Sequence, residues 1–143
     1  MSNLKVRRVS RFHAQLTGII LVTLLTVGSA IADAIPTVSA AALLERINAN
    51  NAPLILDVRR EDEFMAAHIT GAVNIPHTEL KNRLTELARY RNAPVVIHCE
   101  TGRRAAQGAS VLLDAGFSKI SYLEGHMAGW RSGGFPLEEL PNH

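Results

Sequence analysis

The sequence has a single cysteine among its 143 residues, Cys99, and shows no internal repeat, low-complexity tract or internal linker. One cysteine cannot form a disulfide within the chain, so the fold has to be stabilised by its core. A chain of this length is sufficient for one domain with a substantial core. Its 47% hydrophobic and 20% charged residues are typical of a globular protein. We therefore expect one domain.

The sequence also lacks a basic surplus outside its N-terminus. Four of the fifteen Lys and Arg residues are Lys5, Arg7, Arg8 and Arg11, which leaves eleven basic against thirteen acidic residues from Asp33 onward. Proteins that bind nucleic acid neutralise phosphates with clustered basic side chains. The charge balance therefore predicts no nucleic-acid partner.

The N-terminus has three parts that are typical of a secretory signal peptide. A basic segment, 1–15, precedes the uncharged segment 16–32, which ends in the small-residue pattern Ala-Ile-Ala. We expect a signal peptide over 1–32, cleaved after Ala32 or alternatively after Ala34, and a mature domain over 33–143. The alternative is an uncleaved anchor, since 17 uncharged residues reach the lower limit for a spanning helix of roughly 17–25 residues.

Both interpretations place the domain outside the cytoplasm, because the basic flank holds the N-terminus inside. In a bacterium with two membranes this compartment is the periplasm, and contact with the membrane is expected only if the segment is retained. An unpaired thiol in an oxidising compartment can be oxidised or cross-linked. This risk favours a functional role for Cys99.

From Ile35 onward, short apolar runs alternate with amphipathic stretches. Ser39 and Thr78 are placed to cap helices, and Gly116 is placed to end one. The alternation predicts an α/β fold with a mainly parallel central sheet and helices on both faces. The expected strands are 54–58, 72–76, 94–99 and 119–123, and the expected helices are 40–48, 61–68, 79–90, 103–115 and a last short helix or turn ending near 133–134.

Cys99 ends the most apolar expected strand, and a helix is expected to begin a few residues later. Reactive groups gather at the carboxyl ends of strands in open α/β sheets. The intervening residues can curl their N–H groups around the sulfur, and the helix N-terminus adds positive charge. These residues are Glu100, Thr101, Gly102, Arg103 and Arg104.

Positive charge around a cysteine favours the thiolate, which is the nucleophilic form. The loop after Cys99 therefore suits a sulfur nucleophile that attacks a small anionic substrate. The alternative is a small core residue at the end of a strand, because buried cysteines are common. The spacing alone does not identify the anion.

Three motifs, in order, resemble those of the rhodanese sulfurtransferases. They are "LILDVRREDEFMAAHITGAVNIP" at 54–76, "HCETGRRA" at 98–105 and "YLEGHMAGW" at 122–130. The middle motif fits the C-x-x-G-x-R active loop of that family. The resemblance covers about 35–136 and implies a single rhodanese-like domain.

The resemblance implies a persulfide mechanism. The Cys99 thiolate would take the sulfane sulfur of thiosulfate or a similar small anionic donor, and the loop N–H groups over 100–104 would hold the persulfide. Arg104 would orient the loop or meet the donor, with Arg103 as a second contact. A thiophilic acceptor, cyanide or a thiol, would then remove the sulfur. No metal or organic cofactor is implied.

Two positions depart from the family pattern. Ala67 stands where glycine usually precedes His-Ile, and His126 stands where the second glycine of Glu-Gly-Gly is usual. We expect the first change to matter little and the His126 side chain to point to solvent. The alternative for His126 is that it controls access to the active loop or donates a hydrogen bond there.

Asp57 and Arg59 match the D-x-R motif of the family. We expect a charge pair that ties loops together, with a direct catalytic part as the alternative. His98 should face away from Cys99, because side chains alternate along a strand.

Three more residues are given no part in the site by the sequence. His68 and His77 lie near expected turns and have no metal-ligand spacing with each other or with Cys99. Trp130 is expected to pack as a lid over the edge of the core.

Two other functions compete with sulfur transfer. A cysteine phosphatase or arsenate reductase has the pattern C-x5-R, but Ala105 stands six positions after Cys99 and Arg104 stands at five. The shorter loop fits a sulfur-sized group better than a phosphate. A non-catalytic sulfur carrier or partner-binding module remains the other alternative, because carriage and chemistry would use the same cysteine.

Overall fold

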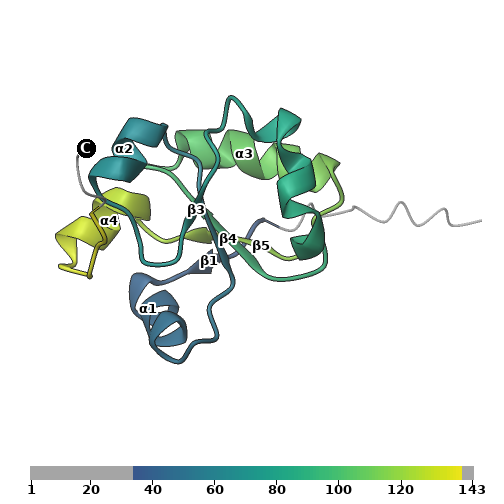
Figure 1. Ribbon diagram of the computed structural model, residues 1–143. Coiled ribbons are helices and arrows are strands. Elements are labelled where there is room, and N and C mark those ends of the chain that lie inside the picture. Colours follow the sequence, from purple (N-terminus) through teal and green to yellow (C-terminus); the bar gives the residue numbers. More distant parts are fainter. Residues whose placement is uncertain (1–33, 140–143) are drawn as a thin grey trace, which may run out of the picture. The chain divides into compact units, whose positions relative to one another are not determined.

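The computed structural model describes residues 34–139, and the predicted signal peptide or anchor lies outside this part of the chain. Within the described part, no helix is long and apolar enough to cross a membrane. Five strands form one sheet in the order β1-β5-β4-β2-β3, and all neighbouring pairs are parallel (Figure 1). The strands are β1 (Thr37–Val38), β2 (Leu54–Asp57), β3 (Val73–Asn74), β4 (Val95–His98) and β5 (Ile120–Leu123).

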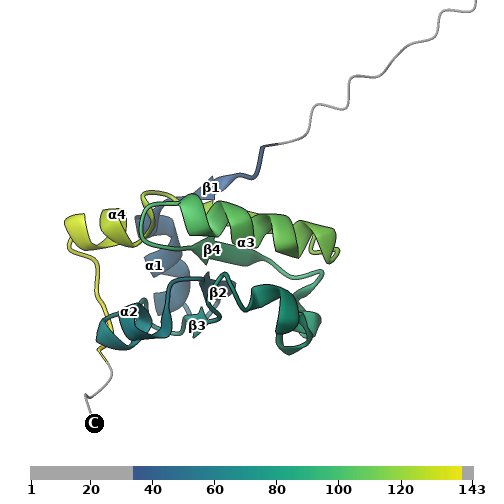
Figure 2. The same ribbon diagram turned by 90° about the horizontal axis from the view of Figure 1, so that it is seen from above.

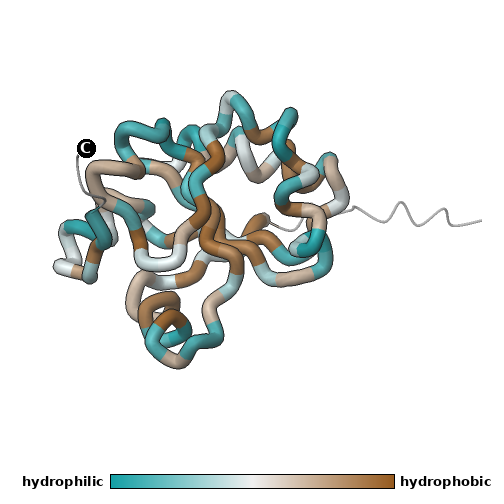
Figure 3. Tube along the Cα trace, in the orientation of Figure 1, coloured by the Kyte–Doolittle hydropathy of each residue, from teal (hydrophilic) through white to brown (hydrophobic). Residues whose placement is uncertain are grey.

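Helices cover both faces of this sheet, and each face has its own apolar core. The helical elements are α1 (Ala40–Asn48), α2 (Glu61–Ala66), the 3-10 helices η1 (Leu80–Asn82) and η2 (Leu84–Tyr90), α3 (Arg103–Asp114) and α4 (His126–Ser132). Side chains of α3, η1 and η2 bury one face, and side chains of α1 and α4 bury the other. Figure 2 shows α3 lying along the sheet, and Figure 3 shows the hydrophobic strands between the helical layers.

The structure confirms the predicted α/β class and most of its elements. Helix α1 has the predicted bounds, and its first turn is capped by the Ser39 hydroxyl, which accepts a hydrogen bond from the Ala42 N–H at 3.2 Å. Gly116 follows α3 with a φ of +84°, the left-handed conformation expected after a helix end. Strand β1 was not predicted, because two residues at a sheet edge are too short to show a periodic pattern.

The predicted helix over 79–90 is wrong in type. This segment forms two 3-10 helices that are separated at Arg83, and Thr78 does not cap them. The Pro76 carbonyl accepts the N–H groups of both Glu79 and Leu80, at 2.8 and 3.0 Å, so the first donors are already satisfied. The spacing of the leucines still indicates the buried face, but it does not distinguish 3-10 from α winding over so short a stretch.

Helix α3 packs unusually close to the central strand β4. A Cβ added at Gly108 would lie 2.9 Å from Cδ1 of Ile97, so the absence of a side chain allows this approach. The helix N-terminus is thereby held near the carboxyl end of β4, where Cys99 lies.

Candidate active site

Cys99 directly follows the central strand and is 1% exposed. The Gly102 N–H donates a hydrogen bond to Sγ at 3.1 Å. Gly102 has a φ of +115° and is the N-cap residue of α3, so the chain turns back toward the sulfur before the helix begins. A side chain at this φ would be strained, which is the physical reason for glycine in the loop.

A cavity of about 370 Å³ opens at the sulfur. It brings together four of the predicted site residues with two that were not predicted to lie there. Its lining is His77, Cys99, Thr101, Arg103, Arg104 and Gln107. Apart from Cys99, each lining side chain is polar, so the cavity suits a small polar or anionic molecule.

The two missed residues differ in how far the sequence could have revealed them. Gln107 lies four positions after Arg103, so helical spacing puts both on the same face of α3. His77 comes shortly after β3, and its position beside the Cys99 loop depends on the order of the strands. The sequence pattern does not give that order.

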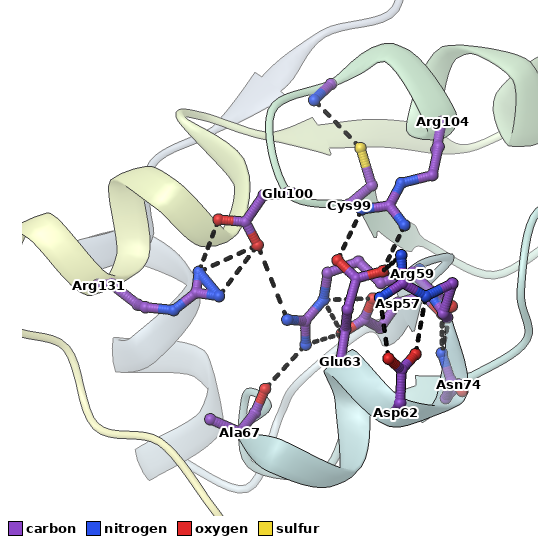
Figure 4. A network of polar contacts seen from close by, with 12 residues as sticks. Asp57, Arg59, Asp62, Glu63, Ala67, Asn74, Cys99, Glu100, Arg104 and Arg131 are labelled. Atoms are coloured by element: carbon purple, nitrogen blue, oxygen red, sulfur yellow. Dashed lines mark hydrogen bonds and ion pairs between the residues drawn. The ribbon is translucent and has the colours of Figure 1, made fainter.

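Arg104 is held by α2. Its guanidinium donates to both carboxylate oxygens of Glu63, at 2.6 and 2.9 Å (Figure 4). These hydrogen bonds lower the pKa of Glu63 to about 2, and they raise the pKa of Arg104. The contact fits the loop-orienting role expected for Arg104. Arg103 is exposed and has no carboxylate partner within residues 34–139, so its charge is available to an anion.

The Glu100 side chain is turned away from the cavity and toward α4. Its carboxylate accepts hydrogen bonds from Arg131 at 2.8 to 3.1 Å and lies 3.8 Å from Nη1 of Arg59. The N–H groups of Met127 and Ala128 donate to the Cys99 and Glu100 carbonyls at 3.0 and 3.1 Å. The active loop is thus also held by hydrogen bonds to α4.

Asp57 and Arg59 form a buried ion pair beneath the loop. The Arg59 guanidinium contacts the Asp57 carboxylate at 2.6 to 3.0 Å and donates to the Ala67 carbonyl at 2.9 Å. Asn74 donates to the carbonyls of both residues, at 2.9 and 3.0 Å. These contacts join the segments after β2 and α2 to β3, in agreement with the expected charge pair. Neither residue lines the cavity.

His126 does not point to solvent, so the expectation for this residue is wrong. Its ring lies against the active loop, where a Cβ added at Gly102 would be 2.8 Å from Nε2. Nδ1 is buried and has no hydrogen-bond partner among the described residues, and burial lowers the pKa of the ring. His126 itself has a φ of +53°, the left-handed conformation that suits the glycine usual at this position. That conformation directs the side chain back to the loop.

His98 is fully buried and faces away from Cys99. Ile97 and Cys99 contribute to the core beneath α3, so alternation places His98 on the opposite face with Val96. Its Nε2 lies 3.9 Å from the Asp57 carboxylate, and neither ring nitrogen has a hydrogen-bond partner in the part of the chain that the structure describes. Burial lowers its pKa to about 4, so the ring is neutral at pH 7.

Trp130 is also not where it was expected. It is fully buried in the core on the α1 side and donates its indole N–H to the Pro136 carbonyl at 2.8 Å. It is a core residue and not a lid at the edge. His68 is buried, stacks on Phe64 with ring centroids 3.9 Å apart and lies outside the cavity.

Residues 34–139 contain no cluster of three or more His, Cys, Asp or Glu side chains that could hold a metal ion. The arrangement that they do contain is a buried sulfur at a helix N-terminus, a backbone N–H directed at it and a polar cavity with two arginines. Such an arrangement can hold a nucleophilic thiolate beside a small anion.

Comparison with known proteins places this fold and loop in a family. Residues 39–133 match the Rhodanese-like domain. Thiosulfate sulfurtransferase PspE of Escherichia coli is 31% identical over 65 residues, which are 46% of this chain and 62% of PspE. The uncharacterized Escherichia coli protein YibN is 32% identical over 85 residues, 59% of each chain. The chain thus spans about three fifths of the length of these curated relatives.

Among solved structures, a thiosulfate sulfurtransferase from Pseudomonas aeruginosa has a TM-score of 0.67 and 29% identity, and the match covers 74% of this chain and 20% of that one. The matched residues 39–133 contain the cysteine loop, the Asp57–Arg59 pair and α4. The chain therefore belongs to the rhodanese-like domain family, which has sulfurtransferases among its members.

Proposed function

We propose that this protein is a sulfurtransferase that moves a sulfane sulfur from thiosulfate, or a similar small anionic donor, to a thiophilic acceptor through a persulfide on Cys99. The observation that carries the proposal is the position of the Cys99 sulfur. It receives the Gly102 N–H at 3.1 Å and opens into a polar cavity that Arg103 and Arg104 line. The family membership supports the same chemistry.

The reaction has two displacements. The Cys99 thiolate attacks the outer sulfur of thiosulfate, a new S–S bond forms, and sulfite leaves with the electron pair of the broken S–S bond. The acceptor then attacks the outer sulfur of the Cys99 persulfide, and the electron pair of that S–S bond returns to Cys99 as thiolate. Neither step needs an external oxidant or reductant.

The charges of the cavity suit the donor. Within residues 34–139 no carboxylate pairs with Arg103, so it can meet the sulfonate oxygens of thiosulfate, while Arg104 is held by Glu63 and keeps the loop in place. The loop length also supports sulfur over phosphate, because Arg104 stands five positions after Cys99 and a cysteine phosphatase needs one more residue to surround a tetrahedral phosphate.

The test is turnover of purified protein with thiosulfate and cyanide. We expect thiocyanate to form, Cys99→Ala to abolish it, and the intact mass after thiosulfate alone to increase by one sulfur atom. Thr101→Ser serves as the control variant in the same loop and should retain the added sulfur. Absence of turnover together with hydrolysis of an aryl phosphate would contradict the proposal.

We also propose that the domain acts outside the cytoplasm, after cleavage of residues 1–32. The proposal is supported by the basic, apolar and small-residue segments of the N-terminus. N-terminal sequencing of protein from the producing cell should find Asp33 or Ile35 as the first residue. An intact N-terminus in the membrane fraction would indicate a retained anchor.

A further inference from the structure

We propose that His77 is the general base of the second displacement and takes the proton from a thiol acceptor as that thiol attacks the Cys99 persulfide. This inference rests on the proposed sulfur transfer and adds a catalytic residue to it. It also assigns the acceptor a class, since a thiol carries a proton that has to be removed and an acceptor such as the sulfite dianion does not.

Main-chain hydrogen bonds connect His77 to the cysteine across the sheet. The His77 N–H donates to the Val58 carbonyl at 3.1 Å, and the Val58 N–H donates to the His98 carbonyl at 3.0 Å. His98 directly precedes Cys99. His77 is therefore held at the carboxyl edge of the sheet, in line with the cysteine, on the far side of β2.

Both side chains are open to the same acceptor. Strand β2 lies between β3 and β4, and neighbouring strands are about 4.8 Å apart, so the backbones of β3 and β4 are separated by about 10 Å. The His77 and Cys99 side chains line the same cavity of about 370 Å³. A thiol bound in this cavity therefore has both the imidazole and the sulfur in its lining.

The backbone at His77 is well supported. The preceding Pro76 carbonyl accepts the N–H groups of Glu79 and Leu80, at 2.8 and 3.0 Å, and the Leu80 side chain is fully buried. The start of η1 thus forms a compact turn that fixes the direction in which the imidazole leaves the chain. A positioned base contributes far more to the rate than a mobile one.

The lining of the cavity leaves His77 as the proton acceptor by elimination. Thr101 and Gln107 are neutral side chains, and Arg103 and Arg104 remain protonated in proteins. Cys99 carries the transferred sulfur at this stage. A neutral imidazole has one ring nitrogen that can accept a proton, and no hydrogen bond or ion pair engages the His77 ring within residues 34–139.

The other described histidines are not available for this step. His98 is buried on the opposite face of the sheet, and His68 is stacked on Phe64. His126 lies behind Gly102 and does not line the cavity. His77 therefore differs from them in having both a free ring and a place at the reacting sulfur.

The proposed step is balanced in atoms and electrons. His77 takes the proton of the thiol R–SH, and the resulting thiolate attacks the outer sulfur of the persulfide. A new S–S bond forms as R–S–S⁻, the Cys99–sulfur bond breaks, and its electron pair remains on Cys99 as thiolate. The proton on His77 then passes to water.

The experiment loads the full-length protein with thiosulfate and follows the decay of the Cys99 persulfide by mass with sulfite or with glutathione as the acceptor, in mildly alkaline buffer where sulfite is mainly the dianion and glutathione is still mainly the thiol. We expect His77→Gln to lower the glutathione rate about a hundredfold, the lower range for a general base, and to change the sulfite rate by less than about threefold. Added imidazole should restore glutathione transfer to His77→Gly, which has space for it. A purely structural role would not produce that rescue.

Gln107→Ala is the matched control, because Gln107 lines the same cavity and cannot move a proton. It should change the two rates by similar factors. Equal losses with both acceptors in His77→Gln, or an unchanged glutathione rate, would overturn the role of His77, while thiocyanate formation by the wild-type protein would still support sulfur transfer. Failure of the wild-type protein to form the persulfide would instead overturn both proposals.

Discussion

Arg104 and Glu63 join the active loop to α2 through two hydrogen bonds, at 2.6 and 2.9 Å, between side chains that are 41 positions apart in the sequence. The pair keeps Arg104 in the lining of the cavity. Of the two loop arginines, Arg103 is the one that has no carboxylate partner within residues 34–139. The two loop arginines therefore have different surroundings, and substitutions at each should have different effects.

The Glu63–Arg104 pair should make stability depend on acid pH. The pKa of Glu63 falls from 4.5 to about 2 on folding, because Arg104 hydrogen-bonds its charged form. As the pH falls, Glu63 is therefore protonated in the unfolded chain before it is protonated in the folded chain. The stability that the pair contributes is complete above pH 4.5 and is lost as the pH falls toward 2. We expect the free energy of unfolding, measured by urea titration, to decrease less over this pH range in Glu63→Gln than in the wild type.

Glu86→Gln is the control for this measurement. Glu86 is also paired with an arginine, Arg83, but its side chain is half exposed. Solvent screens such pairs, so its removal should change the acid profile less than Glu63→Gln. Identical profiles for wild type and Glu63→Gln would contradict the prediction.

His98 should cause a second loss of stability on acidification, which begins at a higher pH than the loss caused by Glu63. Burial lowers its pKa from 6.5 to about 4, so the unfolded chain binds a proton between these values when the folded chain does not. Stability should therefore fall as the pH decreases from 6.5 to 4, with a slope of at most about 1.4 kcal/mol per pH unit for one proton. His98→Leu should remove this slope in denaturant titrations at pH 7 and pH 5. If the slope persists in the variant, another group is responsible.

The contact between Gly102 and His126 should make Gly102 intolerant of a side chain. A Cβ there would lie 2.8 Å from Nε2 of His126, and the φ of +115° disfavours any L-residue. We expect Gly102→Ala to lower stability by about 1–3 kcal/mol and to reduce persulfide formation, because its N–H would leave Sγ. Thermal melting and the mass gain with thiosulfate measure the two effects.

The double variant Gly102→Ala with His126→Gly separates the two causes. It removes the steric contact but keeps the backbone strain, so stability should recover only in part. If the double variant regains all of the stability lost in Gly102→Ala, the backbone conformation at residue 102 does not destabilise the variant. If it regains none, the contact with His126 does not.

Arg59 should be far more important for stability than its neighbour Arg60. Arg59 is buried with Asp57, and breaking a buried ion pair from one side costs about 3–5 kcal/mol because the remaining charge is uncompensated. Arg60 is paired with Asp62 at the surface, where its side chain is 66% exposed. We expect Arg59→Met to lower the denaturant midpoint strongly and Arg60→Met to leave it nearly unchanged. Equal effects would contradict a structural role for the Asp57–Arg59 pair.

Local pattern in the sequence was sufficient for the α/β class, for most strands and helices and for the cysteine loop. Strand runs such as Val95–His98, the cap at Ser39 and the glycine after α3 all depend on neighbouring residues, so they can be predicted from short stretches. The same is true of Cys99, Gly102 and Arg104, whose spacing within one loop resembles that of the rhodanese family. The winding of the segment 80–90 could not be predicted, because i,i+3 and i,i+4 contacts bury the same leucines over so few turns.

Only the tertiary structure decided which distant side chains meet at that loop. Glu63 reaches Arg104 because α2 follows β2 at the same edge of the sheet, and His77 enters the cavity because β3 pairs beside β2. His126 turns to Gly102 through a backbone conformation that its residue type does not predict. A sequence pattern specifies each element's own periodicity, whereas strand order and helix placement depend on packing energy summed over the whole core.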